Sequence, residues 1–359
     1  MNTSTNQALP FQAITTTLQG AVKLVSSVPS VRFMIRGEPG VGKSAQARAI
    51  ADALGMDCAY IDCANLSLGA LAIPVPNHDT GTINWYQNAR FKLEKGEPVV
   101  ILLDEFLKAG IDEMNMLHPL LEVDNPRLGD TPVPEGSVII LTGNMDTDGV
   151  GDKLEEHTRQ RIVEIVVEKP TAKQWLEWAS LNGINSLVRA WVDRYPYALD
   201  SYLNGHTNEF NFDPTKPQRN CVSPRVLEIA SRIIDQRAAI DDDQALEAAL
   251  CGAGGAAFGT SLMAFQRFQD SMPSPQAIAS DPNNTPIPTE TGARAVMVYG
   301  LAARVEKDTF DAFLTYVTRM EEEWQCVFCI NVAKNPNKQE IAFHNGSFKQ
   351  WLIDNEDLL

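Results

Sequence analysis

The sequence has few cysteines, no long apolar run and a deficit of basic residues. Six cysteines in 359 residues are too few for a disulfide scaffold, and no apolar run approaches the ~20 residues that span a bilayer. Thirty lysines and arginines against forty-six aspartates and glutamates give a net charge of −16. A protein that binds the phosphate backbone of nucleic acids without sequence preference needs a basic surface. These deficits exclude a secreted disulfide protein, a membrane span and a basic nucleic-acid coat.

What remains is an ordinary globular composition. The chain is 44% apolar and 21% charged, which distinguishes it from a disordered chain, and its length is typical of two or three domains of ~150 residues. Residues 1–11 are polar and lack the apolar core of a secretory signal, so we expect a cytoplasmic protein. Cys326 and Cys329 form a single C-x-x-C, short of the four ligands that a zinc ribbon needs. We therefore expect them to be thiols of the core.

Short apolar runs alternate with helical stretches in the first half of the chain. A helix is predicted over Lys43 to Leu54, ending at Gly55. Apolar strands separated by helices are typical of a parallel sheet covered on both faces, so we expect an α/β fold. The predicted strands are Val31 to Ile35, Ala59 to Ile61, Val99 to Leu103, Val138 to Leu141 and Ile162 to Val167.

Strand signals become rare after Thr171, and the rest of the chain is predicted to be helical. Ser223 and Pro224 are suited to the N-cap and first position of an amphipathic helix. Five prolines between Met272 and Pro288 indicate a linker. The pattern therefore predicts a second, helical domain and a further helical region beyond the linker.

The segment Gly37 to Ser44 matches the pattern G-x-x-x-x-G-K-[ST] in full, between a predicted strand and a predicted helix. Its glycines let backbone N–H groups turn toward a polyphosphate, and the helix N-terminus adds positive charge. Lys43 would reach the β- and γ-phosphates, and the Ser44 hydroxyl would bind Mg²⁺. The alternative is a chance glycine-rich turn. The residues expected to bind the nucleotide are Pro39, Gly40, Val41, Gly42, Lys43, Ser44 and Ala45.

Two adjacent carboxylates follow the predicted strand Val99 to Leu103. Asp104 would hold Mg²⁺ through water, and Glu105 would orient and polarise the attacking water. The alternative is an acidic strand end that caps the next helix. Beside a complete phosphate loop, a nucleoside triphosphatase is the interpretation that we favour.

With these motifs and three further ones, the chain resembles an AAA+ ATPase of the MoxR-like group. Val138 to Asn144 is similar to the sensor-1 strand, which implies that Asn144 helps to position the water near the γ-phosphate. Gln160-Arg161-Ile162 stands where the group has Asp-Arg-Phe or Asn-Arg-Phe, so the aromatic residue is missing. The resemblance makes Arg161 the candidate arginine finger for a neighbouring subunit, with Arg159 in reserve; a surface arginine is the alternative. Arg225, after Ser223-Pro224, would be sensor 2.

The resemblance also implies an architecture and partners. We expect a five-stranded parallel AAA+ domain over 1–170, a helical lid with sensor 2 over 171–270, and a linker with a C-terminal helical region over 271–359. Such proteins generally form hexameric rings, bind ATP and Mg²⁺, and act as chaperone-like machines, often beside a von Willebrand factor A domain protein. Leu68 to Trp85 and Asp124 to Gly136 stand where the group carries insertions, although both could be plain surface loops.

Two other functions stay open at this point. A nucleic-acid motor, such as a helicase loader or a restriction-system NTPase, shares the phosphate loop and the Asp-Glu pair. The acidic balance and the lack of a recognisable DNA-binding module argue against nucleic acid as a partner. A nucleotide-gated scaffold without turnover would not need Glu105 as a base.

Overall fold

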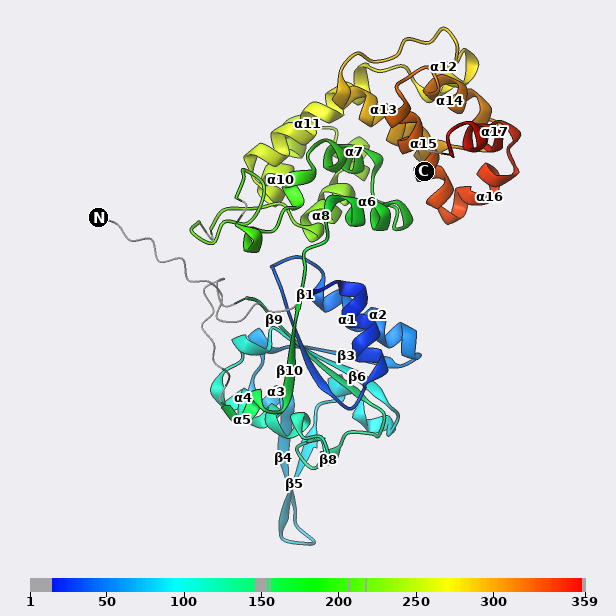
Figure 1. Ribbon diagram of the computed structural model, residues 1–359. Coiled ribbons are helices and arrows are strands. Elements are labelled where there is room, and N and C mark those ends of the chain that lie inside the picture. The colour runs from blue at the N-terminus through cyan, green and yellow to red at the C-terminus, as the bar shows by residue number, and fades with distance from the viewer. Residues whose placement is uncertain (1–14, 146–153, 155, 206, 217, 357–359) are drawn as a thin grey trace. The chain divides into compact units, whose positions relative to one another are not determined.

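The computed structural model describes residues 15–145, 154, 156–205, 207–216 and 218–356. The chain divides into two compact units, residues 1–169 and 170–359, and each is described by itself (Figure 1). Within the described ranges, no helix combines the length and the apolar character needed to cross a bilayer.

A parallel sheet of six strands in the order β1-β10-β2-β9-β6-β3 forms the centre of the first unit. All five predicted strands are present, and β1 adds a short sixth, so the predicted α/β fold is confirmed. Because the strands are parallel, the segments that follow β2, β9 and β6 meet at one edge of the sheet. The strands are β1 (Thr15–Thr16), β2 (Arg32–Arg36), β3 (Asp57–Asp62), β6 (Val99–Asp104), β9 (Val138–Gly143) and β10 (Ile162–Val167).

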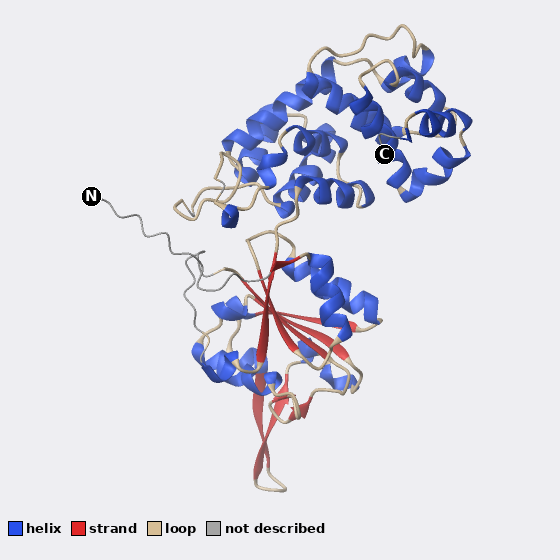
Figure 2. Cartoon of the chain, viewed as in Figure 1, coloured by secondary structure: helices blue, strands red, loops and turns tan. Residues whose placement is uncertain are grey.

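Helices cover both faces of this sheet (Figure 2). Phe33 and Ile35 of β2 belong to a core cluster with α1 and α2, whereas Met34 between them belongs to the cluster on the opposite face. This alternation of side chains along a strand buries β2 on both faces. The helices of this unit are α1 (Leu18–Ser27), α2 (Lys43–Leu54), α3 (Leu68–Leu71), α4 (Ile111–Leu117) and α5 (Glu156–Arg159).

Both predicted insertions form antiparallel hairpins. The first pairs β4 (Ala72–Asn77) with β5 (Thr82–Gln87), and the second pairs β7 (Arg127–Leu128) with β8 (Thr131–Pro132). The Trp85 backbone N–H donates to the Asp130 carboxylate at 2.6 Å, which ties the two hairpins together. The β4–β5 hairpin projects from the sheet domain in Figures 1 and 2.

The second unit consists of helices around α13, whose residues are buried over most of its length. Arg189 of α7 donates to the Asn331 side chain of α15 at 3.1 Å, and its guanidinium lies 5.5 Å from the centre of the Tyr299 ring of α13. Helices on both sides of residue 271 thus share one core. The helices are α6 (Ala172–Leu181), α7 (Ser186–Arg194), α8 (Pro224–Asp235), α9 (Arg237–Ile240), α10 (Asp243–Gly254), α11 (Ala256–Ser271), α12 (Pro275–Ser280), α13 (Thr291–Arg304), α14 (Phe310–Val317), α15 (Glu322–Lys334), α16 (Pro336–His344) and α17 (Gly346–Asp354).

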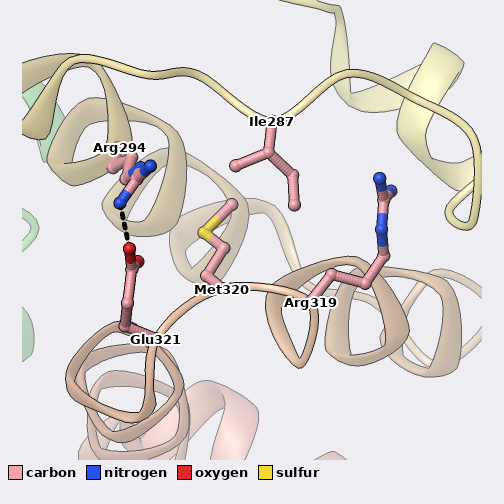
Figure 3. A pocket seen from close by; sticks show the side chains of 5 residues that line it. All are labelled: Ile287, Arg294, Arg319, Met320 and Glu321. Carbon is pink, nitrogen blue, oxygen red and sulfur yellow. Dashed lines mark hydrogen bonds and ion pairs between the residues drawn. The ribbon is translucent and has the colours of Figure 1, made fainter.

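The proline-rich segment between α11 and α13 is held against the helices. Arg319 donates to the carbonyl oxygens of Pro282 at 2.6 Å and Thr285 at 2.9 Å. Arg294 Nε donates to the carbonyl oxygen of Pro288 at 2.7 Å. The segment therefore lies along the helical core. Beside it is an open hollow of about 460 Å³ (Figure 3), lined by Ile287, Arg294, Arg319, Met320 and Glu321.

Candidate functional site

The loop between β2 and α2 has the backbone that a phosphate loop requires. Gly40 and Gly42 have φ angles of 74° and 102°, in the left-handed region that favours glycine. A Cβ atom on Gly37 would lie 2.8 Å from the carbonyl oxygen of Val167 in β10. Glycine at position 37 therefore lets the start of the loop lie directly against the neighbouring strand.

Lys43, at the first turn of α2, points back into this loop. Its Nζ donates to the carbonyl oxygens of Gly37 at 2.8 Å and Glu38 at 2.9 Å, and to Asn144 Oδ1 at 3.0 Å. Asn144 follows β9, which lies between β2 and β6. The predicted phosphate-binding lysine and the predicted sensor-1 amide therefore meet at the same edge of the sheet.

Asp104 ends β6 beside the same loop. Its Oδ1 atom accepts hydrogen bonds from the Ser44 hydroxyl at 2.8 Å and from the Thr142 hydroxyl. Its Oδ2 atom accepts a hydrogen bond from the Tyr60 hydroxyl at 2.8 Å. Three hydroxyl groups from α2, β9 and β3 thus fix both oxygens of this carboxylate. Sequence reasoning anticipated Ser44 and missed Thr142 and Tyr60.

Glu105 turns sharply away from the sheet. Its φ angle of 53° lies in the left-handed region, where non-glycine residues are uncommon and often functional. Its backbone N–H donates to the Thr142 hydroxyl at 3.0 Å, and its carboxylate forms an ion pair of 2.8 Å with Lys108. Both partners are partly exposed, so this pair costs little to open.

A buried arginine fixes the position of Asn144. Arg36, only 6% exposed, donates from Nη2 at 2.9 Å and from Nε at 3.2 Å to the Asn144 carbonyl oxygen. Its Nη1 lies 3.2 Å from the Glu164 carboxylate on β10. Sequence reasoning missed this contact, although Glu164 interrupts the apolar strand Ile162 to Val167. Arg36 joins the ends of β2 and β9 to β10.

Arg161 lies at the opposite edge of the sheet from the phosphate loop. It directly precedes β10, where Ile162 pairs with Arg32 at the start of β2. Its guanidinium contacts Glu122 at 3.1 Å and His118 Nε2 at 2.9 Å. Arg159, the reserve candidate, is exposed at the end of α5.

Arg225 belongs to the second unit, at the start of α8. Ser223 caps this helix, as predicted, and accepts a hydrogen bond from the Val226 N–H at 3.3 Å. The Arg225 side chain is exposed. Its assignment as sensor 2 stays a prediction.

The donors near Asp104 suit a magnesium ion. A serine hydroxyl and a carboxylate are hard oxygen ligands, and Mg²⁺ usually keeps several waters and takes its other ligands from substrate phosphates. Within the described ranges, no group of three His, Cys, Asp or Glu side chains could hold a metal ion by itself. Ser44 and Asp104 therefore fit a metal that arrives with a nucleotide.

Taken together, the parallel sheet, the glycine loop that opens α2 and the carboxylates after β6 define a P-loop domain. Residues 33–166 match the family model described as "ATPase family associated with various cellular activities (AAA)". This part of the chain is thus an AAA domain, and the helical unit lies outside the match. No curated protein sequence matches this chain.

Three solved structures are similar to parts of the chain. NtrX from Brucella abortus in complex with ADP is 17% identical with a TM-score of 0.39, over 84% of this chain and 63% of NtrX. A mutant of RuvB from Thermotoga maritima is 15% identical with a TM-score of 0.36, over 84% of this chain and 85% of RuvB. Hsp104 in the S. cerevisiae Hsp104:casein complex is 20% identical with a TM-score of 0.33, over 45% of this chain and 34% of Hsp104. The chain thus spans less than two thirds of NtrX and of Hsp104.

Replacing Gly37 with alanine tests the close approach of the loop to β10. The added Cβ would lie 2.8 Å from the Val167 carbonyl oxygen and 2.9 Å from Val167 Cγ2, so the loop must shift. Overpacking of this kind costs ~1–3 kcal/mol, and we expect ATP affinity to fall about tenfold. Calorimetric titration with ATP measures the change.

Gly69→Ala is the matched control for this variant. A Cβ atom on Gly69 meets no atom within 4 Å, so this variant should bind ATP like the wild type. Wild-type affinity in Gly37→Ala would show that the contact with β10 does not shape the loop.

Proposed function

We propose that this protein is a magnesium-dependent ATPase that works as a MoxR-like AAA+ ring, hexameric and cytoplasmic, and remodels or activates a partner protein. One observation carries the proposal. Lys43 contacts Asn144 at 3.0 Å and Ser44 contacts Asp104 at 2.8 Å, so four residues from three separate sequence motifs meet at one edge of the sheet.

Each of these residues has a chemical task. The Lys43 ammonium would bind the oxygens of the β- and γ-phosphates in the glycine loop. Ser44 and Asp104 would hold Mg²⁺, which neutralises phosphate charge when it is bound. The Asn144 amide can donate to phosphate and accept from water.

Glu105 is the proposed base. Its carboxylate would leave Lys108, approach the attacking water and take its proton as the water oxygen bonds to the γ-phosphorus. The bond between the γ-phosphorus and the oxygen that bridges to the β-phosphate breaks in the same reaction, so that ADP and phosphate leave. The exposed pair with Lys108 is weak enough to open in each cycle.

The position of Arg161 supports an active site shared between two subunits. The five paired residues from Ile162 to Val166 run alongside β2 up to Arg36, where the phosphate loop begins. At ~3.3 Å per residue, this separates Arg161 from its own loop by roughly 16 Å. An arginine so far from its own nucleotide can act only on that of a neighbour, as the resemblance implies. A closed ring gives every subunit such a neighbour.

The β4–β5 hairpin supports contact with a protein client. Its large apolar side chains are exposed although they belong to a regular hairpin. Exposed apolar surface of this kind marks interaction sites. We propose that the client is a protein and, by resemblance, that a von Willebrand factor A domain protein works beside the ring. The exposed side chains are Ile73, Val75, Ile83, Trp85 and Tyr86.

Mixing two inactive variants tests the shared site. An Arg161→Ala subunit keeps its own Lys43, and a Lys43→Ala neighbour keeps its own Arg161, so one intact site forms where the two meet in the right order. At equal amounts, random pairing around a closed ring would restore roughly a quarter of wild-type ATP turnover. Phosphate release across a series of mixing ratios measures the rescue.

Mixtures of Arg159→Ala with Lys43→Ala distinguish the two candidate fingers. If ATP turnover were rescued only in the mixture that contains Arg159→Ala, Arg159 and not Arg161 would be the arginine finger. Turnover that stays at the baseline for both arginine variants would contradict a site built from two subunits. A basal rate that DNA raises and salt suppresses steeply would favour a nucleic-acid motor instead.

A further inference from the structure

Tyr60 lies on the edge strand β3, and its side chain reaches the carboxylate of Asp104. It pairs with Leu102, two residues before Asp104 on β6, so Tyr60 and Asp104 point to the same face of the sheet. Its hydroxyl donates to Asp104 Oδ2 at 2.8 Å, although half of the side chain is exposed. A partly exposed tyrosine whose hydroxyl is hydrogen-bonded to a single carboxylate indicates a functional role for that hydrogen bond.

The two carboxylate oxygens of Asp104 have different hydrogen-bond donors. Ser44 and Thr142 both donate to Oδ1, which leaves Oδ2 to Tyr60. Without Tyr60, the carboxylate could turn about the two donors on Oδ1.

We propose that Tyr60 is a positioning residue that sets the affinity of the nucleotide site for Mg²⁺ by fixing the orientation of Asp104. The inference rests on the proposed function, because Asp104 acts on the metal only when a nucleotide brings it. Residues that orient a metal ligand change metal affinity 10–100-fold when they are replaced. Tyr60 acts through Asp104 and leaves the phosphate loop to bind the nucleotide.

Tyr60→Phe tests this role, because it removes the hydroxyl and keeps the ring. We expect the Mg²⁺ concentration at half-maximal ADP binding to rise about tenfold or more. ADP affinity in EDTA should stay at the wild-type value, since the phosphate loop is intact. Titration of fluorescent ADP binding with Mg²⁺ gives both quantities without turnover, and the Mg²⁺ dependence of phosphate release should shift in parallel.

Tyr197→Phe is the matched control. Tyr197 is also exposed, and its hydroxyl donates to the carboxylate of Glu209 at 3.3 Å. That carboxylate is not a proposed metal ligand, so the Mg²⁺ titration of this variant should follow the wild type. Superimposable Mg²⁺ curves for Tyr60→Phe and wild type would overturn the role of Tyr60 and leave the proposed function intact. Equal loss of ADP affinity with and without Mg²⁺ would also overturn it, by showing a structural effect. If the wild-type protein bound no nucleotide, that result would contradict the proposed function as well.

Discussion

Lys43→Ala is expected to lower ATP hydrolysis by about 10²–10³-fold or more, since a preorganised charged donor at the transferring phosphoryl group is lost. The ammonium group contacts two carbonyl oxygens of the loop and the Asn144 amide. Its removal takes one positive charge away from the phosphates and leaves the loop without its central donor. Phosphate release and ATP titration of the purified variant measure turnover and binding.

Lys23→Ala is the matched control for this variant, because Lys23 is an exposed lysine on α1 of the same unit. It should keep wild-type turnover. Thermal unfolding of both variants shows whether each folds. Folded Lys43→Ala protein with unchanged hydrolysis would contradict the assignment of the phosphate loop.

Glu105→Gln separates ATP binding from ATP cleavage. The amide has the shape of the carboxylate but cannot take a proton, so we expect hydrolysis to fall about 10²–10⁴-fold while ATP affinity stays near that of the wild type. ATP should therefore remain bound, and the ring should be stabilised by it. Quenched-flow detection of bound ATP and analytical ultracentrifugation measure the two effects.

The exposed Glu135 provides the control for the loss of a carboxylate, and Glu135→Gln should hydrolyse ATP like the wild type. If Glu105→Gln kept full turnover, another group would have to be the base. A variant that stayed monomeric with bound ATP would count against the ring.

The sheet and the phosphate loop could be predicted because local patterns determine them. Continuous apolar strands specify a parallel sheet buried on both faces, and Gly55 ends α2 at the predicted residue, in the left-handed conformation. The helix that begins at Pro224 likewise has Ser223 as its cap. In each case, neighbouring residues in the sequence are enough to specify the element.

The remaining contacts of the site depend on strand order and register. The Tyr60 hydroxyl meets Asp104 across 44 residues of sequence, and Arg36 meets Glu164 across 128. Neither pair forms a short motif, so only the arrangement of β3 beside β6 and β10 beside β2 brings them together. A charged residue inside an apolar strand, such as Glu164, is a signal of such a partner.

The dependence of ATP turnover on protein concentration tests the central claim most directly, namely that two copies of this chain enclose one nucleotide. Phosphate release per chain is measured with Mg²⁺ and ATP over a dilution series, beside sedimentation at each concentration. We predict that turnover per chain falls as the rings dissociate, because Arg161 then has no neighbouring site to complete. Constant turnover per chain in dilute samples of single copies would contradict the account.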